Sequence, residues 1–311
     1  MKVGFVGLGT MGASMAMNAL KRQHSLTVHD LDRKRAADLE AAGAQWAASP
    51  AEAARGADVV LLSLPGPAEF KAVTLGEGGL IEGVASGQAI FDLTTNSPTV
   101  VREVAAVFAE KGVHLLDAPV SGGPQGAKTG KMAVWVGGDQ AAYDTFLPVI
   151  RSISDQPRYI GPVGAGSIAK LVHNVTGYML SAAIAESFTM GVKAGLDPEP
   201  LWEAVRQGAL GRRRIFDSMS LQYLPGRFDP PDFALALARK DVALACEVGR
   251  EFDVPMKFAH MTLAEMTDAM NRGWAGRDSR TMMLLQEERA GVEVRVAQDR
   301  IDQIIREDGK A

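Results

Sequence analysis

Two side chains able to handle a proton and an oxygen atom lie one helical turn apart in this chain. Lys170 and Asn174 are four residues apart in a stretch with helical spacing of apolar residues, so both project from one face. An amine beside an amide can hold a substrate hydroxyl and donate to its oxygen as a carbonyl forms or is reduced. The alternative interpretation of Lys170 is a solvated surface charge. His173 is the rival base, although a packed or helix-capping histidine is the simpler account.

A hydroxyl and unobstructed backbone amides follow a predicted strand in the run Ser121-Gly122-Gly123. Backbone N–H groups that no side chain covers can cradle a carboxylate, and the serine adds a donor. The alternative is an ordinary loop, for which serine and glycine are equally suitable. These three residues are therefore candidates for holding the acid group of a substrate.

A third segment indicates dinucleotide binding. Gly7-Leu8-Gly9-Thr10-Met11-Gly12 fits the pattern G-x-G-x-x-G between a predicted strand and a predicted helix. Such glycines allow a tight turn and close approach of a pyrophosphate to helix amides. The second strand ends at Asp30, at about the ~20-residue distance where a carboxylate meets the adenosine ribose. The alternative interpretation of Asp30 is a solvated loop acid or a helix cap.

The charge near Asp30 bears on the choice of coenzyme. A carboxylate at the ribose edge repels a 2′-phosphate, so the sequence predicts NAD as the preferred coenzyme. Arg33 follows closely and keeps NADP use possible.

The elements that position these residues follow from the hydrophobic pattern. In the first half, amphipathic stretches separate most of the strand-like runs, which are Lys2–Val6, Leu26–His29, Val59–Ser63, Ala89–Leu93 and Val113–Asp117. This alternation predicts an α/β fold with a doubly wound parallel sheet. Two late strands are predicted at Met132–Val136 and Arg158–Ile160, around a helix at Asp139–Ser152.

Beyond the Pro/Gly cluster at 161–166, strand signals nearly vanish. A proline-free helix from Ser167 to about Lys193 would be ~40 Å long, enough to connect two domains. Further helices are predicted at Pro198–Arg206, Phe233–Phe252, Lys257–Arg272 and Ser279–Arg289. The charged tail from Ala297 is either one more helix or a frayed end. We therefore expect a dinucleotide-binding domain at 1–162, a long interdomain helix at 163–193 and an all-helical domain at 194–311.

Composition limits the class of partner. The 311 residues carry 33 Lys and Arg against 37 Asp and Glu, a net charge of −4, so no basic excess exists to bind nucleic acid. The single cysteine, Cys246, excludes an internal disulfide and fits a reducing compartment. The most apolar helical stretch, 168–184, contains Lys170 and His173 and is a poor membrane span. No metal site is indicated, and we expect a cytoplasmic protein without a membrane partner.

The segments above match, in order, the four motifs of a known family. They are Gly7–Asn18, Asp117–Gly123 with Gly130, Gly164-x-Gly166-x3-Lys170-x3-Asn174, and Lys240-Asp241. This arrangement resembles the β-hydroxyacid dehydrogenases, the group that contains 3-hydroxyisobutyrate dehydrogenase and tartronate semialdehyde reductase. The resemblance extends to about Gln286. It implies a Rossmann-type domain, a long interdomain helix and an all-helical C-terminal domain that packs into a homodimer or homotetramer.

The resemblance also implies roles for single residues. The coenzyme site would comprise Gly7, Gly9, Thr10, Met11, Gly12, Asp30, Leu64, Pro65, Thr95 and Lys240. The substrate site would comprise Ser121, Gly122, Gly123 and Phe233, an aromatic that helps close the cleft. Lys170 would be the catalytic group and Asn174 its positioning partner. The implied activity interconverts a small β-hydroxyacid and its semialdehyde with NAD, and Lys170 exchanges the proton.

Two departures from the family pattern bear on the substrate. His173 stands where relatives often have Asn, and Arg212-Arg213-Arg214 replaces small or aromatic residues after Gly211. An arginine in the cleft would bind a second anionic group, so the sequence predicts a substrate with a polar group beyond its first carboxylate. A solvated turn or an oligomer contact is the alternative for these arginines.

Two other functions remain open at this point. One is reduction of an anionic semialdehyde of the tartronate, succinate or sulfolactate type as the physiological direction. The other is a non-catalytic dinucleotide-binding module. The presence of Lys170 with Asn174 disfavours imine reduction, and the length of 311 residues disfavours a 6-phosphogluconate dehydrogenase.

Overall fold

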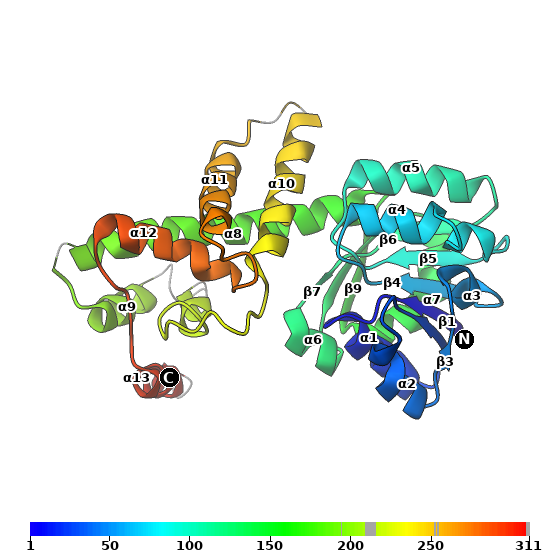
Figure 1. Cartoon of the computed structure of the whole chain (residues 1–311), viewed down its shortest axis with the longest axis horizontal. Helices are drawn as coiled ribbons and strands as arrows, with labels where there is room; N and C mark the ends of the chain where they lie inside the picture. The colour runs from blue at the N-terminus through cyan, green and yellow to red at the C-terminus, as the bar shows by residue number, and fades with distance from the viewer. Residues whose placement is uncertain (194, 209–215, 252, 254, 309–311) are drawn as a thin grey trace. The chain divides into compact units, whose positions relative to one another are not determined.

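The computed structural model describes the chain except for residues 194, 209–215, 252, 254 and 309–311. It divides into two compact units, Met1–His173 and Asn174–Ala311 (Figure 1). The boundary between them falls inside one helix, α8 (Ala165–Lys193). None of the described helices combines the length and the apolar character needed to cross a membrane.

The first unit is built on one sheet, as the strand pattern predicts. Its strands are β1 (Lys2–Val6), β2 (Ser25–His29), β3 (Gln45–Trp46), β4 (Val59–Leu62), β5 (Ala89–Asp92), β6 (His114–Asp117), β7 (Val120–Ser121), β8 (Ala133–Gly137) and β9 (Gln156–Gly161). The order is β3-β2-β1-β4-β5-β6-β8-β7, with β9 paired to β8. All pairs from β3 to β6 are parallel, whereas β8 runs antiparallel to β6 and β7. The predicted α/β fold is confirmed, and the strands β3 and β7, two residues long each, are additions to the prediction.

Helices cover both faces of this sheet. They are α1 (Gly12–Lys21), α2 (Ala37–Ala41), α3 (Pro50–Ala54), α4 (Pro67–Leu75), α5 (Pro98–Ala109), α6 (Gly123–Thr129) and α7 (Gln140–Ile153), with the 3-10 helices η1 (Arg33–Ala36) and η2 (Leu80–Glu82). Side chains of β4 alternate between two cores: Val59 and Leu61 pack with α1 and α7, and Val60 and Leu62 pack with α4 and α5. A strand buried on both faces must be apolar throughout, which explains the continuous run Val59–Leu62.

The second unit contains helices and no strand among its described residues. After α8 come α9 (Pro198–Gln207), η4 (Phe216–Ser220), α10 (Leu235–Glu251), α11 (Lys257–Asn271), η5 (Ser279–Met282), α12 (Met283–Ala290) and α13 (Gln298–Asp308). Helices α10 and α11 pack against each other (Figure 1). The fully buried Trp202, Tyr223 and Leu235 belong to its core. The charged tail forms a helix, one of the two outcomes considered from the sequence.

A buried carboxylate fastens the start of α8 to the sheet. Asp117, the last residue of β6, accepts hydrogen bonds from Gly164 N at Oδ1 (2.7 Å) and from Ser167 N at Oδ2 (2.6 Å). The first N–H groups of a helix lack partners within the helix, so this carboxylate satisfies them and complements the helix dipole. Burial raises the pKa of Asp117 above its ordinary value. The site of Lys170, one turn later, is thereby fixed relative to the strand ends.

Loss of this carboxylate is expected to destabilise the first unit. In Asp117→Asn, an amide group must face one of the two backbone N–H donors, so a buried hydrogen bond is lost. We expect the free energy of unfolding to fall by about 2–4 kcal/mol, measured by urea denaturation. The control is Asp139→Asn at the exposed cap of α7, where Ala142 N donates to Asp139 Oδ1 (2.7 Å). Asparagine caps as well as aspartate, so a change below about 0.5 kcal/mol is expected there. Equal losses in both variants would contradict the anchoring role.

Candidate active site

The turn between β1 and α1 has the form that a pyrophosphate needs. A Cβ at Gly7 would collide with Ser63 O, and a Cβ at Gly12 would collide with Gly7 O. Gly9 has no such neighbour; the nearest atom to a Cβ there is Arg35 Nη1 at 3.8 Å. Two glycines therefore allow the turn to pack, and the third leaves its outer surface open. Thr10 and Met11 complete the turn before the first N–H groups of α1. These features fit a dinucleotide.

Asp30 supports the glycine turn directly. Its Oδ2 accepts a hydrogen bond from Leu8 N (2.6 Å), and its Oδ1 accepts one from Asp32 N (2.9 Å). Asp30 therefore holds the glycine turn, a role that the sequence prediction of a ribose-binding carboxylate did not include. Its position at the end of β2 remains suited to the ribose edge.

The arginine beside Asp30 is Arg35 rather than the expected Arg33. Arg35 Nη1 lies 3.8 Å from Asp30 Oδ2. Arg33 instead lies 3.5 Å from Glu40 and stacks over the ring of Trp46, 5.5 Å from its centroid. The reason is the turn of η1, which Asp32 caps by accepting from Lys34 N and which directs the two guanidiniums to different places. The expectation that Arg33 accompanies Asp30 is corrected.

The expected coenzyme wall comes from two neighbouring strand ends. Leu64 and Pro65 follow β4, and Thr95 follows β5, which pairs with β4 in parallel. Leu64 N donates to Thr94 Oγ1 at 3.1 Å, so the two loops are joined. Ligands of such sheets bind at the carboxyl ends of the strands, where these loops lie.

The expected carboxylate cradle lies at the end of β7. Ser121 pairs with Ala133 of β8 and is half-buried. Gly122 has a φ of 146° and Gly123 a φ of 61°, conformations that disfavour any side chain. A Cβ at Gly122 would also stand 3.1 Å from Lys131 O. Backbone amides at this corner therefore stay uncovered, as a carboxylate ligand requires.

Lys170 lies on α8 and is only 9 % exposed, which contradicts the interpretation as a solvated surface charge. Lysine is rarely buried this deeply, and burial of an amine favours proton-exchange chemistry. His173 packs against Trp135 of β8, with ring centroids 5.2 Å apart. His173 is nevertheless exposed, so this ring contact is made at the surface and the histidine is not part of the core.

In the second unit, one buried acid joins two of the expected site residues. Asn174 Nδ2 donates to Asp241 Oδ2 at 2.6 Å, and Lys240 Nζ lies 3.0 Å from Asp241 Oδ1. The side chain of Asp241 has no exposed surface. It therefore fixes the amide of α8 and the amine of α10 at once. Asp241 has no assigned role in the sequence prediction, although it stands in the Lys240-Asp241 motif and on the buried, mostly apolar face of α10.

Phe233 is held just before α10 by another buried acid. Asp278 Oδ2 accepts from Asp232 N (3.1 Å) and Phe233 N (3.3 Å), and its Oδ1 pairs with Arg280. The ring of Phe233 is partly exposed. Residues 212–214, the arginines expected to favour a second anionic group, lie outside the described part of the chain.

Tyr178, one turn after Asn174 on α8, is a further residue that the sequence analysis missed. Burial, together with the nearby charges of Asp241 and Asp278, raises the pKa of Tyr178 well above its ordinary value, against the opposing charge of Arg280. The phenol thus stays protonated and able to donate a hydrogen bond.

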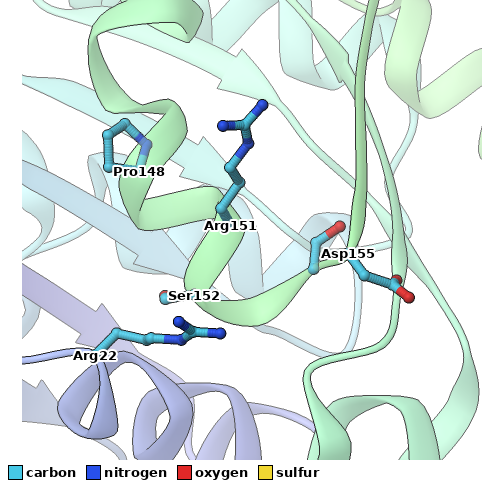
Figure 2. A pocket seen from close by; sticks show the side chains of 6 residues that line it. Arg22, Pro148, Arg151, Ser152 and Asp155 are labelled. Carbon is cyan, nitrogen blue, oxygen red and sulfur yellow. The ribbon is translucent and has the colours of Figure 1, made fainter.

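A cavity of about 310 Å³ lies elsewhere in the first unit. It is lined by Arg22, Pro148, Arg151, Ser152, Ser154 and Asp155. Figure 2 shows the guanidiniums of Arg22 and Arg151 pointing in different directions. None of these residues belongs to the expected coenzyme, substrate or catalytic set, so the cavity is not assigned to the chemistry.

Comparisons with known proteins cover nearly the whole chain. Residues 2–161 match the NAD binding domain of 6-phosphogluconate dehydrogenase, and residues 164–286 match the NAD-binding domain of NADP-dependent 3-hydroxyisobutyrate dehydrogenase. The 2-(hydroxymethyl)glutarate dehydrogenase of Eubacterium barkeri is 32% identical over 94% of this chain and 97% of its own. The NAD-dependent L-serine dehydrogenase of Pseudomonas aeruginosa is 33% identical over 89% of this chain and 95% of its own. The crystal structure of 3-hydroxyisobutyrate dehydrogenase from Salmonella typhimurium is similar with a TM-score of 0.81 and 28% sequence identity. The match covers 92% of this chain and 99% of that one.

Asp241→Asn is expected to impair turnover strongly. The change removes the charge that pairs with Lys240 and places an amide against the amide of Asn174. Loss of one charge-assisted hydrogen bond corresponds to about a 10- to 100-fold fall in kcat, measured by steady-state coenzyme absorbance. The matched control is Asp268→Asn, an exposed acid of α11 that lies 3.6 Å from Arg289. Comparable kcat values for the two variants would show that Asp241 does not organise the site.

Proposed function

The chain belongs to the β-hydroxyacid dehydrogenase family, a group of NAD(P)-dependent oxidoreductases, and we propose that its substrate carries a carboxylate and a hydroxymethyl group on one carbon. The substrates named for the three relatives, 2-(hydroxymethyl)glutarate, L-serine and 3-hydroxyisobutyrate, share this unit. Oxidation of the hydroxymethyl group gives the semialdehyde, and the reverse reaction reduces it. The observation that carries the proposal is the buried Lys170 on the helix that also presents Asn174.

The proposed roles follow the chemistry of each group. The uncovered amides and hydroxyl at Ser121–Gly123 bind the substrate carboxylate. Lys170 takes the hydroxyl proton during oxidation and returns it to the carbonyl oxygen during reduction. Asn174, held by Asp241, orients the same oxygen. The nicotinamide coenzyme supplies the hydride acceptor when bound, against the wall of Leu64, Pro65 and Thr95.

The length of the substrate beyond this unit is a separate part of the proposal. One relative acts on a dicarboxylic acid, 2-(hydroxymethyl)glutarate. The charged run at 212–214 supports a second anionic group in the substrate of this chain too. Reduction of an anionic semialdehyde is the same chemistry in the opposite direction.

NAD is the proposed preferred coenzyme because the carboxylate of Asp30 stands at the end of β2. Arg35, beside Asp30, offsets part of the repulsion toward a 2′-phosphate and leaves some NADP use. The proposed division into domains is 1–162, 163–193 and 194–311.

We further propose that the chain works as a homodimer or homotetramer in the cytoplasm. Phe258 and Met261 of α11 are 73% and 63% exposed, an apolar surface that association would cover. The single cysteine fits a reducing compartment. Analytical ultracentrifugation of the wild-type chain and of the double variant Phe258→Ser/Met261→Ser tests the oligomeric state.

Lys170→Ala is expected to lower kcat by about 10²–10⁴-fold, because a positioned proton-exchanging group is removed. The Kd for NADH should stay within about twofold of the wild-type value. Assays use 3-hydroxyisobutyrate, L-serine and 2-(hydroxymethyl)glutarate, with coenzyme absorbance as the readout. The control His173→Asn should retain substantial activity, because that ring packs on Trp135. Binding of NADH without turnover of any hydroxyacid by the wild-type chain would favour the non-catalytic module instead.

Coenzyme choice is expected to depend on Arg35 and not on Arg33. The wild-type chain should prefer NAD, by about 5- to 150-fold in kcat/KM. Arg35→Ala removes the cation beside Asp30 and should widen this preference by about fivefold or more. Arg33→Ala, whose side chain is engaged by Glu40 and Trp46, should change it by less than about twofold. A wild-type preference for NADP, or the opposite ranking of the two variants, contradicts the assignment.

A further inference from the structure

One buried carboxylate shapes the loop after β5. Asp92, the last residue of β5, is fully buried and accepts from Thr94 N at Oδ1 (3.1 Å) and from Asn96 Nδ2 at Oδ2 (2.8 Å). Asn96 in turn accepts from Ser97 N at 2.8 Å. The backbone of residues 94–97 is therefore arranged around both oxygens of a single side chain.

The same network extends to the loop after β4. Thr94 Oγ1 accepts from Leu64 N at 3.1 Å, and Thr94 is itself buried. Leu64, Pro65 and Thr95 are the residues proposed above as the coenzyme wall. Asp92 acts on this wall through Thr94: it holds the backbone of Thr94, whose hydroxyl holds Leu64 N and which directly precedes Thr95.

We propose that Asp92 is a positioning residue for the coenzyme: through Thr94 and Asn96 it holds both loops of the coenzyme wall, and so sets the affinity for NAD(H). The inference rests on the proposed function only in its assignment of the coenzyme wall. Asp92 itself touches no reacting atom, and it lies outside the four family motifs described above.

The surroundings of Asp92 make this affinity depend on pH. Its strand neighbour in register is Asp117 of β6, the charged group that faces it, while its own loop presents the uncharged Thr94 and Asn96. Burial, with the charge of Asp117 adding, raises the pKa of Asp92 to about 7. The ionised carboxylate accepts at both oxygens. Protonation turns one of these oxygens into a hydroxyl donor that faces another donor. One of the two bonds, to Thr94 N or to Asn96 Nδ2, is therefore lost as pH falls.

Two opposite pH trends follow. Because the folded pKa lies above the ordinary value of 3.8, the stability contributed by Asp92 is lost as pH rises through about 7. Coenzyme affinity changes in the other direction, since the wall is best ordered when Asp92 is ionised. A merely structural acid would give the first trend without the second.

The experiment measures the Kd for NADH by titration calorimetry and the Tm of each variant without coenzyme. Asp92→Asn and Thr94→Ala are expected to raise the Kd about tenfold. Thr94→Ser, which restores the hydroxyl, should return it to within about twofold of the wild-type value. The matched control is Gln88→Leu at the opposite end of β5, where the buried Gln88 amide donates to Ala54 O and Ala57 O. It should lower Tm and leave the Kd within about twofold.

The pH series compares the wild-type chain with Asp92→Asn between about pH 6 and pH 8. In the wild type, we expect the Kd for NADH to rise as pH falls through about 7, and the variant to show a flatter profile. If Asp92→Asn fails to fold, the pair Thr94→Ala and Thr94→Ser decides the question.

The proposal is overturned if Asp92→Asn and Thr94→Ala lower Tm but leave the Kd for NADH unchanged, as Gln88→Leu should. It is also overturned if Thr94→Ser binds as weakly as Thr94→Ala. The titrations contain no hydroxyacid, so they are independent of the substrate. A chain that shows the expected Kd pattern but oxidises no hydroxyacid would contradict the proposed function and support this inference.

Discussion

The bond between the Asp117 carboxylate and the first turn of α8 is the interaction on which the proposed chemistry depends. It joins the end of β6 to Gly164 N and Ser167 N, and from that point a rigid helix carries Lys170. If the helix began one residue earlier or later, its side chains would rotate by about 100°, and Lys170 would leave its place. The position of a reactive amine is thus determined by an acid 53 residues before it in the sequence.

The same device recurs at other strand ends. Asp30 at the end of β2 accepts from Leu8 N, and Asp92 at the end of β5 accepts from Thr94 N. In each case a carboxylate at the carboxyl edge of the parallel sheet satisfies loop N–H groups that have no strand partner. The edge where the coenzyme is expected is therefore ordered by acceptors within the protein. Asp241 does the equivalent work between two helices of the second unit, for Asn174 and Lys240.

Local features of this structure were predictable from the sequence, and long-range pairings were not. The strands, the glycine turn and the helix that carries Lys170 and Asn174 follow from spacing, because each is decided by neighbouring residues. The bond between Asp241 and Asn174 could not be foreseen from the Lys240-Asp241 motif, because the two residues are 67 positions apart. The place of Arg35 beside Asp30 was not predicted, because spacing does not show how η1 turns its side chains. The two-residue strands β3 and β7 are too short to leave a pattern.

The crowding around Asp117 has a consequence for how this chain can vary. A Cβ at Gly166 would stand 2.5 Å from Asp117 O, and one at Gly137 would stand 2.6 Å from Asp117 Oδ1. The first obstacle is backbone, and no change of rotamer relieves it. Gly177 lies on the same helix as Gly166 with nothing within 4 Å of a Cβ, so alanine fits there and suits a helix better. Two glycines of one helix thus differ in mutational tolerance: a side chain can be introduced at Gly177 in the middle of α8 but not at Gly166 near its start.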